Sequence, residues 1–476
     1  MASVVEAGIR KVVTAGVHRL AGFNRARLPV PAAHPFLTGP YAPVAREVDH
    51  VDLKVTGRIP QELDGRYLRN GPNPLGPVDT ASHHWFLGDG MIHGLRLRDG
   101  KAESYRNRWV RSTKVSGLLG EMPAPGPRAL RSDNANTNVV GIGGRIFAIV
   151  EASAYPVELS ADLSTIAHNP FDGTLSGSYS AHPHLDPATG ELHAICYDPE
   201  TPDIVRHVVV SPSARVIRDE PVDLPGGVMV HDCALGPDHV LIFDLPVTLS
   251  MKAYSAGWQF PLRWNPHRRA RVGLLPRQGK GAETIWCDVD PCAVFHVANC
   301  FAPGDGCVVV DLVVHDRMFA RSGWGPDSSR TTFERWTIDP GARAVRRTVL
   351  DDLPQEFPRF DERLATGAYR YAWCTGLQLG DELGPGTFLV HHDLESGRRT
   401  VRDFGQGRYP GEFVFVPRSA GSREADGWLM GLVSDEAEAC AELHILDARA
   451  PDGEAVAIVH IPARVPLGFH GNWIPA

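Results

Sequence analysis

Short apolar runs rich in β-branched and aromatic residues recur along the chain from about residue 45 to the C-terminus. Examples are YLRNG, GLRLRDG, NVVGIGGRIFAIVEA, ELHAICYD, IVRHVVVS, HVLIFDLP, CVVVDLVVHD, TFLVHHDL and WLMGLVSD. Helical periodicity is nearly absent in this region. Segments such as RDGK, DPATGE and DPGAR separate the runs, and their Gly, Pro and Asp residues are typical of turns that join antiparallel strands. The pattern therefore predicts an all-β chain.

The number of predicted strands is too large for a single β-sandwich. A repeated strand, turn, strand unit favours radial repetition, so a β-propeller is the economical architecture. No WD or kelch signature fixes the repeat length, and the number of blades stays open on the pattern alone. Two Pro-rich stretches, 121–128 and 245–276, are expected to be long loops on this scaffold. Such loops often carry binding surfaces.

The N-terminal segment has a different pattern. Apolar side chains recur at helical spacing with basic residues between them, at Val4, Val5, Ile9, Val12, Val13, Val17 and Leu20. This predicts an amphipathic helix over residues 4–20, which either packs on its own protein or makes transient peripheral contact with a membrane. We therefore divide the chain into an N-terminal helix and extension, 1–40, and one propeller domain, 41–476.

Composition and charge narrow the class of protein. Hydrophobic residues make up 43% and charged residues 22%, as in ordinary globular proteins. The net charge of −8 and the lack of basic runs argue against a nucleic-acid partner. The eight cysteines include no C-x-x-C pair, and no apolar run reaches the length of a membrane span. A cytoplasmic location fits these features, with the inner membrane face as the place of any peripheral contact.

Four of the 21 histidines stand in unusually specific settings. His182 lies in SAHPHLDPATGEL, His231 in VMVHDCALGPDH, His296 in FHVANCF and His470 in GFHGNW. They are too far apart in the chain for a zinc finger or a helical H-E-x-x-H site. A propeller could still bring them together, because the inner strands of its blades face one axis.

Eight motifs carry a resemblance to a known family. RNGPNP, HHWFLGDGMIHG, ANTNVV, AHPHLDPATGE, HDCALGPDH, FHVAN, EFPRFDER and GFHGNW follow one another between residues 69 and 473. In composition and order they resemble the motifs of the carotenoid cleavage oxygenases. The resemblance implies a seven-bladed β-propeller capped by loops and short helices, with one Fe²⁺ ion per subunit on its axis.

The same resemblance assigns roles to individual residues. The iron ligands would be His182, His231, His296 and His470. His184 is the competitor of His182, and the family pattern favours His182. Four neutral imidazoles leave the charge of the metal uncompensated, so carboxylates should accept hydrogen bonds from the ligands.

Three glutamates match the family positions for that support. Glu151 would orient His231, Glu356 would orient His296, and Glu412 would orient His470, whereas His182 would have no carboxylate partner. Thr137 matches a position whose methyl group partly occludes one coordination site. A single site would then stay open for O₂.

The implied reaction is oxidative cleavage of a conjugated C=C bond of a carotenoid or apocarotenoid by O₂, which gives two carbonyl products. Stilbene-cleaving relatives carry a Lys immediately before the Glu151 position, and here that residue is Val150. The difference favours a hydrophobic polyene over a stilbene. A lignostilbene dioxygenase, an isomerohydrolase like the visual-cycle retinoid isomerase and a non-catalytic binding propeller remain the alternatives.

Overall fold

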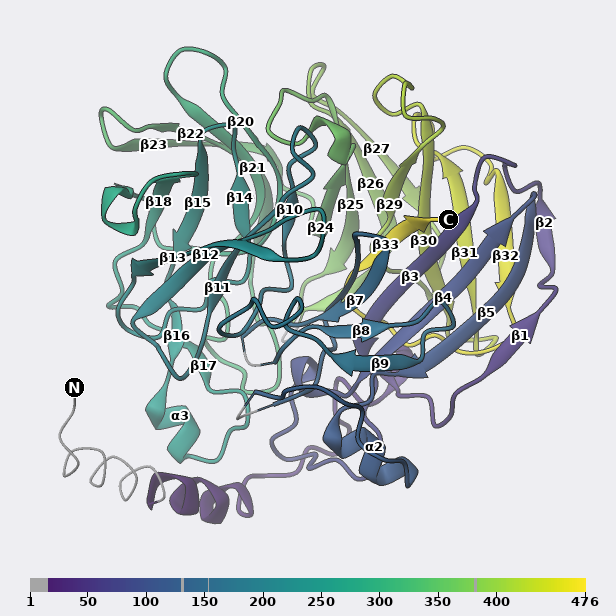
Figure 1. Ribbon diagram of the computed structural model, residues 1–476, viewed down its shortest axis with the longest axis horizontal. Coiled ribbons are helices and arrows are strands. Elements are labelled where there is room, and N and C mark those ends of the chain that lie inside the picture. The colour runs from purple at the N-terminus through teal and green to yellow at the C-terminus, as the bar shows by residue number, and fades with distance from the viewer. Residues whose placement is uncertain (1–15, 130–131, 153, 381–382) are drawn as a thin grey trace.

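The computed structural model describes residues 16–129, 132–152, 154–380 and 383–476. Seven sheets of antiparallel strands surround one axis, and a two-stranded sheet, β16 (Val247–Leu249) with β17 (Leu262–Trp264), lies outside them (Figure 1). The fold is a seven-bladed β-propeller. This confirms the predicted fold class and supplies the blade number that the strand pattern left open.

Blades 2 to 6 follow one another along the chain, and each begins with its innermost strand. Blade 2 is β6 (Asn138–Ile142), β7 (Arg145–Ile149), β8 (Val157–Leu159) and β9 (Thr165–His168); blade 3 is β10 (His184–Leu185), β11 (Leu192–Tyr197), β12 (Ile204–Val210) and β13 (Val216–Asp223); blade 4 is β14 (Cys233–Leu235), β15 (His239–Asp244), β18 (Arg271–Pro276) and β19 (Ile285–Asp288). Blade 5 is β20 (Ala293–Phe301), β21 (Val308–His315), β22 (Thr331–Asp339) and β23 (Ala344–Asp351); blade 6 is β24 (Gln355–Phe360), β25 (Tyr371–Gln378), β26 (Gly384–Asp393) and β27 (Arg398–Asp403).

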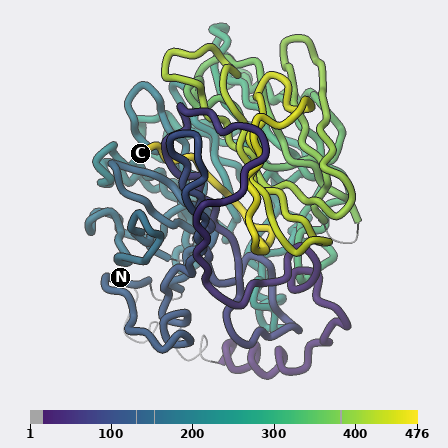
Figure 2. Tube along the Cα trace, turned by 90° about the vertical axis from the view of Figure 1, so that its right-hand side faces the viewer, coloured from purple at the N-terminus to yellow at the C-terminus, as the bar shows by residue number. Residues whose placement is uncertain are grey.

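Blades 1 and 7 are built from both ends of the propeller segment. Blade 1 combines β1 (Asp49–Val51), β3 (Gly65–Pro72), β4 (Gly90–Arg98) and β5 (Lys101–Trp109) with the last strand, β33 (Gly471–Pro475). Blade 7 combines β28 (Arg408–Pro410), β29 (Val414–Pro417), β30 (Gly427–Asp435), β31 (Cys440–Asp447) and β32 (Ala457–Ile461) with the early strand β2 (Val55–Gly57). The purple and yellow ends of the trace accordingly run side by side (Figure 2). The ring is therefore closed by two strand pairs, β33 on β3 and β2 on β32.

The predicted turn at RDGK forms a tight hairpin connection in the structure. In RDGK, Arg98 pairs with Lys101 across the two-residue turn Asp99-Gly100, and both turn residues have positive φ, 49° and 69°. Two successive residues with positive φ define a type I′ turn, which matches the right-handed twist of the strands it joins. A Gly removes the steric penalty at the second position.

Short helices and loops cover one end of the propeller, at the bottom of Figure 1. They include a helix over residues 16–25, α2 (Thr113–Leu119) and α3 (Met251–Ser255). The 3-10 turns η1 (Gly39–Tyr41) and η2 (Trp85–Leu87) contribute residues to the same end, whereas η3 (Gly281–Glu283) joins β18 to β19 and η4 (Glu362–Leu364) follows β24. Residues 4–15 of the predicted amphipathic helix lie outside the described residues. Among the described helices, none is long and apolar enough to cross a bilayer.

The expectation of one long loop over 245–276 is wrong. This stretch holds β16, α3, β17 and then β18, which is a full strand of blade 4. Pro246 and Pro261 lie just outside the short strands β16 and β17, which pair with each other. Proline next to a strand is compatible with pairing because it occupies positions that need no ladder donor. By contrast, residues 121–128 form neither helix nor strand.

A side-chain cluster reinforces the closure of blade 7. The carboxylate of Glu442 accepts from His444 Nε2 at 2.8 Å, contacts His460 Nδ1 at 3.1 Å and pairs with Arg408. On its other side His460 Nε2 lies 2.8 Å from Thr56 Oγ1, which belongs to the closing strand β2. Burial alone would raise the pKa of Glu442, but His444 and Arg408 lower it from 4.5 to about 2.

We therefore predict that Glu442→Gln weakens the acid dependence of stability. Because the folded-state pKa is depressed, the contribution of Glu442 is fully present above about pH 4.5 and is lost as the pH falls towards 2. Urea unfolding midpoints at pH 7, 4.5 and 3 should show the difference between wild type and variant shrinking with acid. Exposed Glu438→Gln serves as the control. An equal difference at pH 7 and pH 3 would contradict the prediction.

Candidate metal centre

The inner strands bring the four predicted histidines to the axis from four different blades. His182 and His231 each stand two residues before an inner strand, β10 in blade 3 and β14 in blade 4. His296 lies inside β20 of blade 5, and His470 immediately precedes β33 of blade 1. Their ring centroids lie 4.3–5.1 Å apart between neighbours. Residues that are remote in the chain thus form one buried cluster of imidazoles.

The nitrogen atoms of the cluster fit a metal ion better than a set of internal hydrogen bonds. His231 Nε2 faces His296 Nε2 at 3.3 Å, and His182 Nε2 is buried without a partner among the described residues. Ligand atoms of these three residues all lie within 4.8 Å of one another. Burial and the neighbouring imidazoles hold the pKa of His182 well below its ordinary value, which keeps it neutral. Converging neutral imidazoles are the usual donor set of a transition metal.

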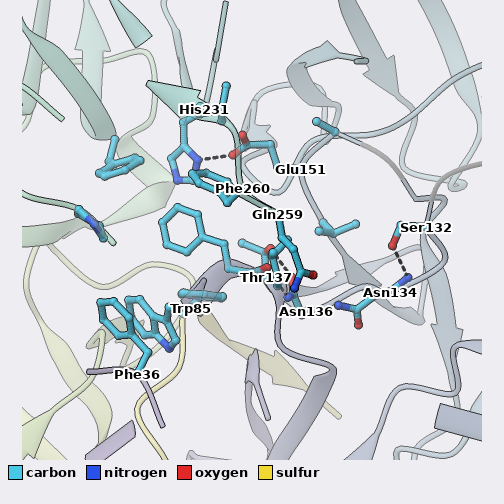
Figure 3. Close-up of a pocket in the computed structure, with 18 of the residues that line it drawn as sticks. Phe36, Trp85, Ser132, Asn134, Asn136, Thr137, Glu151, His231, Gln259 and Phe260 are labelled. Atoms are coloured by element: carbon cyan, nitrogen blue, oxygen red, sulfur yellow. Dashed lines mark hydrogen bonds and ion pairs between the residues drawn. The ribbon is translucent and has the colours of Figure 1, made fainter. Parts of the chain in front are cut away.

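Three carboxylates contact the outer nitrogens of the imidazoles, and two of them, Glu356 and Glu412, are buried while Glu151 is half-buried. Glu356 Oε2 lies 2.5 Å from His296 Nδ1, and Glu412 Oε1 lies 3.1 Å from His470 Nδ1. Glu151 contacts His231 Nδ1 in the same way (Figure 3). When Nδ1–H donates to a carboxylate, the Nε2 lone pair is left for the centre of the cluster. In the described part of the chain no carboxylate pairs with His182.

Each of these glutamates has a second supporting side chain that sequence reasoning missed. Glu412 is 3.3 Å from Arg359 Nη1, and Glu356 Oε1 is 2.8 Å from His315 Nε2. The hydroxyl of Tyr197 donates to Glu151.

These donors keep the carboxylates ionised in spite of their burial. Burial alone would raise the pKa of Glu412, but Arg359 and His470 lower it to about 2. The pKa values of Glu356 and Glu151 are likewise lowered, because their imidazole and phenol partners outweigh desolvation. No local motif could have revealed Tyr197 or His315, since each lies on a different blade from the glutamate that it supports. Arg359 lies within EFPRFDER, three residues after Glu356, but its partner is on blade 7.

Backbone strain accompanies two of the carboxylates. Phe357, next to Glu356, has φ 53° at a register shift of β24, and Ala152, next to Glu151, has φ 48°. A bulge with a left-handed residue redirects the neighbouring side chain, and non-glycine residues in this region are strained. The Phe357 ring stacks on His296 with centroids 4.9 Å apart. The strain therefore occurs where the chain turns its carboxylates towards the axis.

Thr137 stands just before β6 of blade 2 and lines the same cavity as three of the histidines. Its hydroxyl donates to Asn136 Oδ1 at 3.0 Å, and its carbonyl accepts from the backbone N–H of His470 at 3.1 Å. Asn136 is itself fixed, because its amide donates to the carbonyls of Phe86 and Gly88. The hydroxyl is therefore turned towards Asn136, and the methyl group of Thr137 is turned away from it.

His184 takes no part in the cluster. Its Nε2 lies 2.7 Å from Asp232 Oδ1, and Asp232 also accepts from the backbone N–H groups of Cys233 and Val297. His184 begins β10 whereas His182 precedes it, and the two imidazoles contact different groups. The family-motif histidines His83, His84 and His93 are also buried away from the cluster, and His84 caps the turn η2.

A large cavity of about 1120 Å³ opens onto the cluster from the side of the capping helices. His231, His296 and His470 line it, as do Glu151 and Thr137. Its walls are largely apolar and include the rings of Phe36, Trp85 and Phe260 (Figure 3), as well as those of Phe86, Phe295 and Phe469. A second cavity of about 380 Å³ also reaches the cluster and is lined by His182 and His184. The larger space suits an elongated apolar molecule held against the histidines.

Known proteins resemble this chain over nearly its whole length. The family model described as retinal pigment epithelial membrane protein matches residues 41–475. A carotenoid cleavage oxygenase of Mycobacterium tuberculosis is 40% identical, with 93% of this chain and 98% of that protein covered. The chain belongs to the carotenoid cleavage oxygenase family. It is therefore an oxygenase, and the family suggested by its motifs is confirmed.

Other members of the family differ in their named substrates. A carotenoid 9,10(9′,10′)-cleavage dioxygenase of Crocus sativus is 32% identical over 92% of this chain and 89% of its own length. The crystal structure of Pseudomonas brassicacearum lignostilbene dioxygenase superimposes with a TM-score of 0.84 at 27% identity, covering 94% of this chain and all of that one. The carotenoid cleavage oxygenase family thus includes both polyene and stilbene enzymes, and membership alone does not select the substrate.

The geometry predicts that substitutions of His182 and His184 have different effects on metal binding. His182→Ala should lower Fe²⁺ affinity by at least roughly 100-fold, since even outer partners of a metal ligand typically contribute 10- to 100-fold. His184→Gln keeps a donor towards Asp232 and should retain the metal. Metal analysis after anaerobic loading with Fe²⁺ and gel filtration measures both. Retention by His182→Ala together with loss in His184→Gln would reverse the assignment.

Proposed function

We propose that this family member is a non-haem Fe²⁺ dioxygenase that cleaves a conjugated C=C bond of a carotenoid or apocarotenoid. One O₂ is consumed, the double bond breaks, and each former alkene carbon receives one oxygen atom, so that two carbonyl products form. The observation that carries this proposal is a cluster of four imidazoles, three of which line a large cavity rich in aromatic rings. In this proposal residues 41–476 act as one domain with residues 1–40 as its extension.

The histidines and the glutamates of the cluster would have separate roles in holding the metal. His182, His231, His296 and His470 would hold one Fe²⁺ ion through Nε2. Glu151, Glu356 and Glu412 would fix three of these rings by accepting from Nδ1. An Fe²⁺ ion in such a site supplies activation of O₂ towards an electron-rich alkene, with no organic cofactor.

The cavity wall would place the substrate and keep water away from it. Aromatic rings such as Phe86 and Phe295 offer broad apolar contact to a polyene without hydrogen bonds. Thr137 would narrow the approach through its methyl group, since its hydroxyl is bonded to Asn136. Val150 also lines the cavity and offers no charge or hydrogen bond to a phenol, which supports a polyene over a stilbene.

The test is product analysis under ¹⁸O₂. Iron-loaded protein should bleach the absorption of an apocarotenal, and rapidly quenched mass spectrometry should find one labelled oxygen in each of two carbonyl products. Metal-free protein is the control. Absence of label from both products would identify an isomerohydrolase, and cleavage of a stilbene with no polyene would overturn the substrate class. Iron-loaded protein that binds a polyene and converts none would indicate a binding propeller.

We also propose a cytoplasmic enzyme that touches the inner membrane face, where hydrophobic polyenes accumulate. Leu20 and Phe23 on the helix over 16–25 are 49% and 57% exposed, and Met251, which lines the cavity, is 54% exposed. The helix is fixed to the cap by a hydrogen bond of 2.7 Å from Asn24 to the carbonyl of Ser255.

Exposed apolar side chains beside a cavity favour contact with lipid. In co-sedimentation with anionic phospholipid vesicles, Phe23→Ser should reduce the bound fraction of protein. The exposed Val349→Ser, on blade 5, is a matched control. Equal binding by all three proteins would contradict membrane contact through this helix.

A further inference from the structure

Gln259 places an amide in the wall of the large cavity. It lies in the cap segment between α3 and β17, directly before Phe260 (Figure 3). A polar side chain in a largely apolar wall is expected to have hydrogen-bond partners, because an unsatisfied polar group there costs free energy.

A chain of hydrogen bonds fixes which end of this amide is free. Ser82 Oγ donates to Asp79 Oδ2 at 2.8 Å, because a carboxylate can only accept. The single hydroxyl proton is thereby used, so Ser82 Oγ can only accept from the amide atom of Gln259 that lies 2.7 Å away. That atom must be Nε2. The orientation of the amide is thus set by the network and not by a choice between similar atoms.

The amide oxygen is left available to the cavity. No described residue donates to Oε1 of Gln259, and Oε1 is not among the buried atoms that lack a partner. The neighbouring amides of Asn134 and Asn136 cannot serve in its place, since both use their oxygen and their nitrogen within the fold. Gln259 therefore presents a fixed acceptor to whatever occupies the cavity.

We infer that Gln259 is a specificity-determining residue whose Oε1 accepts a hydrogen bond from a hydroxyl group of the substrate. This inference rests on the proposed cleavage of a polyene and narrows its class to polyenes that carry a hydroxyl donor. A carbonyl oxygen at the same place would face Oε1 as a second acceptor and is disfavoured. Most of the remaining wall is apolar, so this acceptor distinguishes two polyenes that differ by one hydroxyl.

The experiment compares two apocarotenals of equal length that differ only in one ring hydroxyl. Wild type should have the higher kcat/KM for the hydroxylated substrate. Gln259→Leu, which keeps the volume and removes the acceptor, should lower the ratio of the two kcat/KM values by roughly 2- to 10-fold, the range of one net hydrogen bond. An unchanged ratio in Gln259→Leu would overturn the inference.

Two further variants distinguish the orientation of the Gln259 amide from the packing of the wall around it. Ser82→Ala releases Nε2 and lets the amide rotate, so the ratio should fall although the amide is present. Phe260→Leu alters the adjacent wall and should change both substrates alike, which leaves the ratio as it was. If Gln259→Leu does not fold, as judged by its thermal transition, Ser82→Ala carries the test, and an unchanged ratio there overturns the inference.

Binding is measured separately from turnover by quenching of tryptophan fluorescence with each polyene. If wild type binds both and cleaves neither, the proposed function fails. The ratio of the two dissociation constants then still tests Gln259 by the same comparison with Gln259→Leu.

Discussion

The pairing of buried carboxylates with buried imidazoles is the interaction on which this molecule depends. Glu151, Glu356 and Glu412 bring three negative charges into the centre of the propeller, where uncompensated charge is very costly. Arg359 supplies one positive charge there, while Tyr197 is neutral. A cation bound among the imidazoles would offset the remaining negative charge. The carboxylates thus favour a positively charged occupant and also fix the orientation of the rings.

The propeller makes this arrangement possible because each blade contributes one residue at the start of its inner strand. In the order of the blades from 1 to 7 these residues are His470, Thr137, His182, His231, His296, Glu356 and Glu412. Glu151 is the exception, since it follows β7 and not an inner strand. A rigid ring of seven strands holds such residues more precisely than mobile loops could. The capping segments contribute to the shape and polarity of the cavity.

Much of this could be predicted from the chain alone, and the failures have physical causes. Strands were recognisable because β-branched runs alternate with turns such as Asp99-Gly100. The family motifs selected the four histidines among 21, including His182 rather than His184. Blade number, ring closure and the roles of Tyr197 and His315 depend on contacts between distant segments, which leave no local pattern. The short strands β16 and β17 were not predicted, because three-residue strands next to prolines have the composition of a loop.

The propeller is closed by strands from both ends of the chain, and this determines when the histidine cluster can form. Blade 1 lacks its inner strand until β33 has been made, and His470 immediately precedes that strand. During synthesis the earlier blades can form in order, but the fourth imidazole arrives only after all the others, together with the strand that locks the ring. Assembly of the centre and completion of the propeller are thus one event.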